Sequence, residues 1–161
     1  TGLTTIELYE NVEKIHAIDI PKNMISIAKG KSEKRGISNI QFDVMDIFDE
    51  KFEKSSFDVI MAFNILYFLK DIDNVMSRIN ELLKPNGIFI SATDCLGEKK
   101  TLMTVIQSLL AKIGAIPYMR KFKVSELKRI IEEGNFSIIE TQNLYDIPPN
   151  YYVVARKNEN W

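Results

Sequence analysis

Four short apolar segments of the sequence each end in a polar side chain that could bind a ligand. Asp19 ends the segment 14–20, Asp46 follows 39–45, Asn64 follows 57–63, and Thr93-Asp94 ends the segment 87–93. A carboxylate only accepts hydrogen bonds, and its two oxygens can receive both hydroxyls of a ribose. Asp19 also has an alternative interpretation as a turn or helix-capping residue, because Pro21 follows it closely. Position alone leaves both interpretations open.

The elements that must position these side chains alternate along the chain. Apolar, β-branched segments predict strands, and apolar stripes at helical spacing predict helices. Strands are expected at 14–20, 39–45, 57–63 and 87–93, and helices at 4–11, 23–35, 71–84, 102–114 and 126–134, the last with Ser125 as its N-cap. Two closing strands, 136–144 and 151–157, are separated by the short connection "YDIPPN".

This alternation predicts an α/β fold with a mostly parallel sheet flanked by helices. The short final connection suits an antiparallel strand pair, because a parallel crossover needs a dozen or more residues. The segment 57–63 is apolar on both faces, which suits the centre of a parallel sheet. Ligands of such sheets bind beyond the carboxyl ends of the strands, so the four polar strand ends are expected to converge on one rim. We expect a single domain over residues 1–161.

Composition excludes several classes of function. With 161 residues, 45% hydrophobic residues and a net charge of −1, the chain gives no general case for a nucleic-acid or membrane partner. The longest apolar run, 63–69, is too short to cross a bilayer. The lone Cys95 excludes an internal disulfide, is expected to be buried, and suits a reducing cytoplasm. No set of Cys, His and carboxylates has metal-ligand spacing, so no metal site is expected.

Five segments in the correct order carry a resemblance to a known family. They are "TG" before a helix, "HAIDIPKNMI", "QFDVMDIF", "FDVIMAFNILYFL" and "INELLKPNGIFI". Together they resemble the class I S-adenosylmethionine-dependent methyltransferases, and within them the small-molecule group that has a "DxSxxM" segment and an "LKPGG" turn. Asn86 departs from that turn, but asparagine tolerates turn conformations. The resemblance covers nearly the whole chain and implies a Rossmann-like fold.

The resemblance also implies roles for individual residues. Gly2 corresponds to the last glycine of the family's cofactor loop, Asp19 to the acidic residue that holds the ribose, and Asp46 to the acceptor of the adenine amino group. The implied cofactor-binding set is Gly2, Asp19, Ile20, Asp46, Ile47 and Asn64, and Tyr67 and Phe68 are implied to face the substrate. Tyr118 is a further substrate-binding candidate, because an aromatic lining suits the methyl-transfer reaction. By composition alone, Ile20, Ile47 and Phe68 could instead be core residues, and Tyr67 a rim aromatic without a ligand.

The implied reaction is methyl transfer from the sulfonium of S-adenosylmethionine to a small-molecule nucleophile. Such a site must mainly hold two reactants in line. A hydroxyl acceptor would need a general base. The sequence offers no convincing base, so no catalytic residue is assigned. The segment 95–123 is expected to form much of the acceptor pocket.

Family members usually have a further strand before the glycine loop, between the strands that correspond here to 14–20 and 57–63. The sequence is therefore interpreted as N-terminally truncated, and inactive if that segment is essential. Alternatively a partner chain supplies the strand, for example in a homodimer, or the two flanking strands pair directly. Two other classes of function stay open: a non-catalytic methyltransferase-like interaction module, and a nicotinamide-dependent oxidoreductase, which also has an acidic residue after its second strand.

Overall fold

The computed structural model describes residues 1–98, 118–146 and 148–159, together with 106, 110 and 114. The chain forms two compact units, Thr1–Lys51 and Phe52–Trp161, each of which has its own sheet. The helix expected at 102–114 lies largely outside the described residues.

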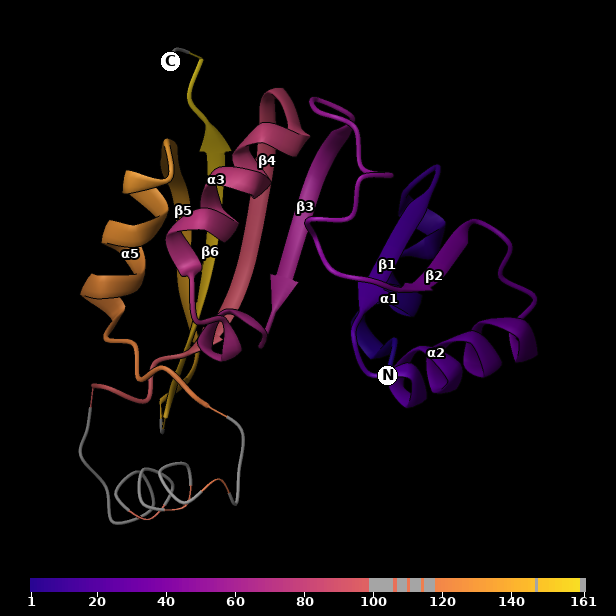
Figure 1. Cartoon of the computed structure of the whole chain (residues 1–161), viewed down its shortest axis with the longest axis horizontal. Coiled ribbons are helices and arrows are strands. Elements are labelled where there is room, and N and C mark those ends of the chain that lie inside the picture. Colours follow the sequence, from indigo (N-terminus) through magenta and orange to yellow (C-terminus); the bar gives the residue numbers. More distant parts are fainter. Residues whose placement is uncertain (99–105, 107–109, 111–113, 115–117, 147, 160–161) are drawn as a thin grey trace. The chain divides into compact units, whose positions relative to one another are not determined.

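The first unit is a parallel strand pair covered by two helices (Figure 1). It contains α1 (Leu3–Glu7), a short 3₁₀ turn (Tyr9–Asn11), β1 (Ile15–Asp19), α2 (Lys22–Lys34) and β2 (Ile40–Val44). Its core consists of Ile6, Ile25, Ala28 and Phe42. Ala17 of β1 packs against this cluster, so its neighbour His16 faces away from the helices, where its Nε2 lies 2.9 Å from Oδ2 of Asp43.

The second unit is a four-stranded sheet with the strand order β3-β4-β6-β5. Its elements are β3 (Phe57–Phe63), a 3₁₀ turn η2 (Leu66–Phe68), α3 (Ile72–Leu82), β4 (Leu83–Asp94), α5 (Val124–Glu133), β5 (Phe136–Asp146) and β6 (Pro149–Lys157). β3 and β4 are parallel, whereas β6 is antiparallel to both β4 and β5. The expected α/β fold with its closing antiparallel pair is confirmed.

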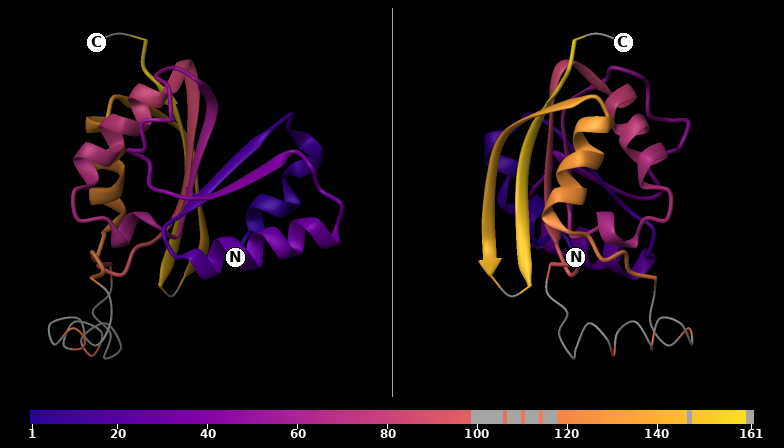
Figure 2. Two further views of the ribbon diagram at one scale, coloured as in Figure 1. Left: turned by 45° about the vertical axis from the view of Figure 1, so that its right-hand side comes forward. Right: turned by 90° about the vertical axis from the view of Figure 1, so that its left-hand side faces the viewer.

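Helices α3 and α5 cover the same face of this sheet (Figure 2). Asp71 caps α3 by accepting a hydrogen bond from the backbone N–H of Asn74 at 3.3 Å. The apolar stripe of α3 is buried as its spacing predicts, at Ile72, Val75, Met76, Ile79 and Leu82. Below the helices, Phe89 of β4 packs on Phe136 of β5, with ring centroids 5.6 Å apart.

Two expectations about these elements are wrong, and one of the alternatives is excluded. Ser125 is not an N-cap: Lys123 occupies that position, and Oε1 of Glu98 accepts the hydrogen bond of the Val124 N–H at 2.6 Å. β3 is not central: within the described residues it pairs with β4 alone, and Val59 and Met61 are exposed. β1 likewise pairs only with β2 in the described part of the chain, so β1 and β3 do not pair directly. Strand order depends on contacts between distant segments, which the local pattern does not encode.

Candidate functional site

The first group of candidate residues lies at the carboxyl ends of β1 and β2. These strands are parallel neighbours, and Asp19 at the end of β1 is in register with Val44 at the end of β2. Asp46 follows Val44 by two residues. The two carboxylates therefore follow adjacent strands at the same end of the sheet, which is the arrangement that a shared ligand requires.

Each of these carboxylates is held by one local hydrogen bond. Oδ1 of Asp19 accepts from the backbone N–H of Ile20 at 2.9 Å, and Oδ1 of Asp46 accepts from that of Phe48 at 2.7 Å. Among the described residues, nothing donates to the second oxygen of either carboxylate. The local bonds fix the orientation of each carboxylate and leave one oxygen for a ligand donor.

Apolar side chains beside these carboxylates are exposed. Ile20 is 69% exposed, and both Val44 and Phe48 are 43% exposed, whereas Ile47 is half-buried. The interpretation of Ile20 as a core residue is therefore wrong. Exposed apolar groups next to acceptors for hydroxyl and amino groups match the mixed surface of a nucleoside, although this role of Ile20 and Ile47 stays a prediction.

Gly2 lies against α2 in a backbone conformation that favours glycine. Its φ is 72°, and a Cβ at this position would lie 2.9 Å from the Cβ of Ala28. The carbonyl of Gly2 accepts a hydrogen bond from the N–H of Ile6 at 2.9 Å, which starts α1. A side chain at position 2 would therefore strain the backbone and displace α2, whatever Gly2 does for a cofactor.

The second group of candidate residues lies at the carboxyl ends of β3 and β4. Asn64 follows β3 with φ of 53°, a left-handed conformation that asparagine tolerates, and its N–H donates to the carbonyl of Ala92 at 2.8 Å. Asp94 ends β4. The Nδ2 group of Asn150 donates to Oδ1 of Asn64 at 3.0 Å and to Oδ1 of Asp94 at 2.6 Å, so one amide joins both strand ends.

Asn150 is a residue that sequence reasoning missed. It is 3% exposed and lies near the start of β6. Because β6 runs antiparallel to β4, the beginning of β6 lies beside the end of β4. The antiparallel connection predicted from "YDIPPN" was the one available signal. It brings the residues after that turn to the ligand-binding end of the sheet only if β6 also pairs with β4, which the sequence does not indicate.

The three aromatic candidates differ in exposure. Tyr67 is 8% exposed, and burial together with the nearby charge of Asp94 raises the pKa of its phenol. Its ring centroid lies 4.5 Å from that of Phe68, which is 38% exposed. Tyr118 is 47% exposed. The N–H of Arg120 donates to the carbonyl of Tyr67 at 2.6 Å, so the end of the expected acceptor-pocket segment passes beside η2.

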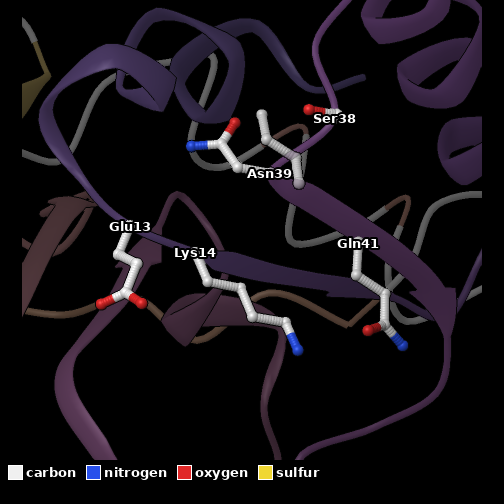
Figure 3. Close-up of a pocket in the computed structure, with 6 residues that line it drawn as sticks. Glu13, Lys14, Ser38, Asn39 and Gln41 are labelled. Carbon is white, nitrogen blue, oxygen red and sulfur yellow. The ribbon is translucent and has the colours of Figure 1, made fainter.

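A shallow pocket lies at the other end of β1 and β2 (Figure 3). It is lined by Glu13, Lys14, Ser38, Asn39, Ile40 and Gln41. These residues precede or begin the strands, whereas ligands of α/β sheets bind beyond the carboxyl ends. We therefore place the candidate site at the strand ends that carry Asp19 and Asp46.

A family model described as a methyltransferase domain matches residues 1–143. The chain belongs to this family. One relative of the methyltransferase domain is phosphoethanolamine N-methyltransferase 2 of Caenorhabditis elegans, 30% identical over 73 residues, which are 45% of this chain and 17% of that protein. Another is the ubiquinone biosynthesis O-methyltransferase of Coxiella burnetii, 24% identical over 152 residues, 91% of this chain and 64% of that protein.

A solved structure gives the same result for the fold. The phosphoethanolamine N-methyltransferase 2 of Haemonchus contortus, in complex with phosphomonomethylethanolamine and S-adenosylhomocysteine, superimposes with a TM-score of 0.75 at 16% identity. The match covers 96% of this chain and 46% of that chain. The domain thus spans less than two thirds of the length of each of these three proteins. Within the described residues, no helix is long and apolar enough to cross a membrane.

Proposed function

We propose that this methyltransferase domain binds S-adenosylmethionine and transfers its methyl group to a small-molecule acceptor. The observation that carries the proposal is the placement of Asp19 and Asp46 at the shared carboxyl end of the parallel pair β1–β2. Membership of the methyltransferase domain family supports the same activity.

In this proposal, the first unit holds the nucleoside part of the cofactor. The unpaired oxygen of Asp19 accepts from the ribose hydroxyls, and that of Asp46 accepts from the adenine amino group. Ile20 and Ile47 lie against the adenine, and Gly2 lets the chain pass close to the methionine part. When bound, the cofactor supplies an electrophilic methyl group, and the residues of this chain orient it toward the acceptor.

For the second unit, we propose that Asn64 contacts the cofactor and that Tyr67, Phe68 and Tyr118 contact the acceptor. No catalytic residue is assigned. The small-molecule nature of the acceptor is supported by a net charge of only −1, which gives no general attraction for nucleic acid or anionic membranes. A cytoplasmic location is supported by the single, buried Cys95.

A homodimer or a preceding segment is proposed to complete the two sheets. In the described part of the chain, β1 and β3 each have one unpaired edge, and unpaired strand edges invite a further strand. A single monomeric peak in size-exclusion chromatography with light scattering, at all concentrations tested, would exclude the homodimer.

Calorimetric titration with S-adenosylhomocysteine tests the activity through its cofactor. The chain should bind, and Asp19→Ala should bind about 10- to 150-fold more weakly, because hydrogen bonds to a charged group contribute about 1.5–3 kcal/mol. The matched control is Asp49→Ala, since Asp49 also caps a turn in this unit, by accepting from the Lys51 N–H at 3.0 Å, but does not end a strand. It should bind like the original chain.

Two results would overturn the proposal. One is equal binding of S-adenosylhomocysteine by the Asp19→Ala and Asp49→Ala variants. The other is tight binding of a nicotinamide dinucleotide by a chain that does not bind S-adenosylhomocysteine, which would favour an oxidoreductase.

A further inference from the structure

Three polar side chains of the second unit, Asn64, Asp94 and Asn150, are joined by hydrogen bonds, and with the nearby Tyr67 we call them the Asp94 cluster. The buried amide of Asn150 joins Asn64 and Asp94 by hydrogen bonds of 3.0 Å and 2.6 Å. Tyr67 is near enough for the charge of Asp94 to act on its phenol. Asn64 and Asn150 are 86 positions apart in the sequence, so the tertiary fold, and not a local turn, brings these residues together.

The cluster has hydrogen-bonding capacity that the protein does not use. The side-chain amide of Asn150 donates hydrogen bonds to two oxygen acceptors, one on Asn64 and one on Asp94, so both of its N–H groups are used. Among the described residues, nothing donates to the second carboxylate oxygen of Asp94, and nothing pairs with the hydroxyl of Tyr67. The Tyr67 side chain is 8% exposed, but its hydroxyl is not one of the buried polar atoms without a partner, which in the described residues are Oγ of Ser91 and Oγ1 of Thr93. The hydroxyl is therefore open to solvent and to a ligand.

The charge of the cluster is also unbalanced. Asp94 is half-buried, and no lysine or arginine in the described part of the chain forms a salt bridge with it. A partly buried carboxylate favours a cation or a strong hydrogen-bond donor as its partner. A phenol is neutral near pH 7, and the raised pKa of Tyr67 only extends that range upward, so its hydroxyl is available as a donor and an acceptor.

The position of the cluster matches that of a ligand site. Asn64 and Asp94 stand at the carboxyl ends of the parallel strands β3 and β4, where ligands of such sheets bind. Phe68, whose ring packs on Tyr67, is 38% exposed and supplies an apolar surface next to the polar groups.

We propose that the Asp94 cluster is the part of the acceptor site that recognises a hydroxyl or ammonium group, with Asp94 accepting its hydrogen bond and Tyr67 contacting the same group. The inference rests on the proposed function, because it names the class of acceptor for that activity. It makes Asp94, Tyr67 and Asn150 specificity-determining residues and assigns no proton transfer to them.

Binding of small probes tests the inference without the cofactor. Ethanolamine carries both donor groups, and acetate is a probe of similar size that only accepts hydrogen bonds. In ¹⁵N-labelled protein, ethanolamine should shift the side-chain amide resonances of Asn150 and Asn64 in a saturable way, and acetate should not. Asp94→Asn keeps an oxygen that can accept from Asn150 but loses the charge, so ethanolamine should bind about tenfold more weakly.

Asp58→Asn is the matched control, because Asp58 lies near the opposite end of β3 and pairs with Lys84. It should bind ethanolamine like the original chain. Tyr67→Phe keeps the ring and removes only the unpartnered hydroxyl, so it should weaken the probe without lowering the unfolding midpoint. A purely structural role of the hydroxyl would lower that midpoint instead.

The inference is overturned if ethanolamine causes no saturable shift, if acetate causes the same shift, or if Asp94→Asn binds ethanolamine unchanged. None of these results depends on binding of S-adenosylhomocysteine. A chain that binds S-adenosylhomocysteine but not ethanolamine would retain the proposed function and lose this inference. A chain that binds ethanolamine but not S-adenosylhomocysteine would lose the proposed function, and the cluster would then be a donor-binding site without an assigned acceptor role.

Discussion

Two strands of this molecule end in the same way and lie in different surroundings. β1 ends in Asp19 followed by the apolar Ile20, and β4 ends in Asp94 followed by the apolar Cys95. Ile20 is 69% exposed, whereas Cys95 is fully buried. Asp19 accepts its hydrogen bond from the next residue in the chain, whereas Asp94 accepts from Asn150, which is 56 positions away.

This difference in burial follows from the positions of β1 and β4 in their sheets. β1 belongs to a two-stranded sheet, whose strand ends stay open, while β4 has a strand on each side and a helix layer over one face. One local pattern, an aspartate and then an apolar residue, thus produces an open carboxylate in the first unit and an embedded one in the second. Under the proposed function, the first group of strand ends admits a ligand by its exposure, and the second selects one by its fixed polar groups.

Thiol labelling tests the difference in exposure between Ile20, which follows β1, and Cys95, which follows β4. Burial raises the pKa of Cys95 from 9.0 to about 12. Because the thiolate is the reactive form, Cys95 should react with a maleimide at least about a thousandfold more slowly than an exposed cysteine of ordinary pKa. The comparison is Ile20→Cys in a Cys95→Ala background, measured at pH 7.5. Similar rates would mean that the end of β4 opens readily.

Removing a polar side chain should lower the free energy of unfolding more at the strand ends of the second unit than at those of the first. Asn150→Ala leaves two oxygen acceptors without their donor, one of them a half-buried carboxylate, and should lower the free energy of unfolding by about 1–3 kcal/mol. Asp46→Ala removes one exposed local hydrogen bond and should cost about 0.5–1 kcal/mol. Urea denaturation measures both. Equal costs would remove the distinction between local and long-range organisation.

The smallest expected effect is on the pH dependence of stability, and it concerns Asp43 of the first unit, whose carboxylate contacts His16 on the neighbouring strand. The side-chain amide of Gln41 donates to Asp43 at 2.6 Å and, with a further contribution from His16, holds the pKa of Asp43 below its ordinary value of 3.8. A lowered pKa stabilises the fold above about pH 4, and this stabilisation is lost as the pH falls through the pKa of the folded state.

Asp43→Asn should therefore be less stable than the original chain at pH 7, and the difference should shrink as the pH falls below about 4. Circular dichroism during urea denaturation, at a series of pH values, measures the gap. A gap that stays constant with pH would mean that the ionisation of Asp43 does not stabilise the first unit.

The sequence predicted the elements well because their patterns are local. The strand at Phe57–Phe63 has the expected bounds, and the stripe on α3 is buried as its spacing requires. Cys95 is buried as expected. The sequence does not predict the exposure of Ile20, because isoleucine is more often a core residue than part of a ligand surface.

Longer-range features could not be predicted in the same way. The role of Asn150 depends on where β6 inserts, and nothing within "PPNYYVVARK" specifies its partner. The edge position of β3 depends on whether any distant strand pairs with its other side, which the local pattern does not encode either. The cap of α5 was misassigned for the same reason, since Glu98 reaches Val124 from 26 residues away. Ser125 has the side chain of a cap but lies inside the helix.

The placement of β6 between β4 and β5 has a consequence for biosynthesis. Residues 149–157 form β6, the strand that lies between β4 and β5 and pairs with both. Until these residues have left the ribosome, β5 therefore cannot join the sheet. Until then, β4 exposes one of its edges, and Asn64 and Asp94 lack the amide that connects them. Closure of the four-stranded sheet should therefore wait until this short segment has emerged from the ribosome, and until then the unpaired edge of β4 favours aggregation.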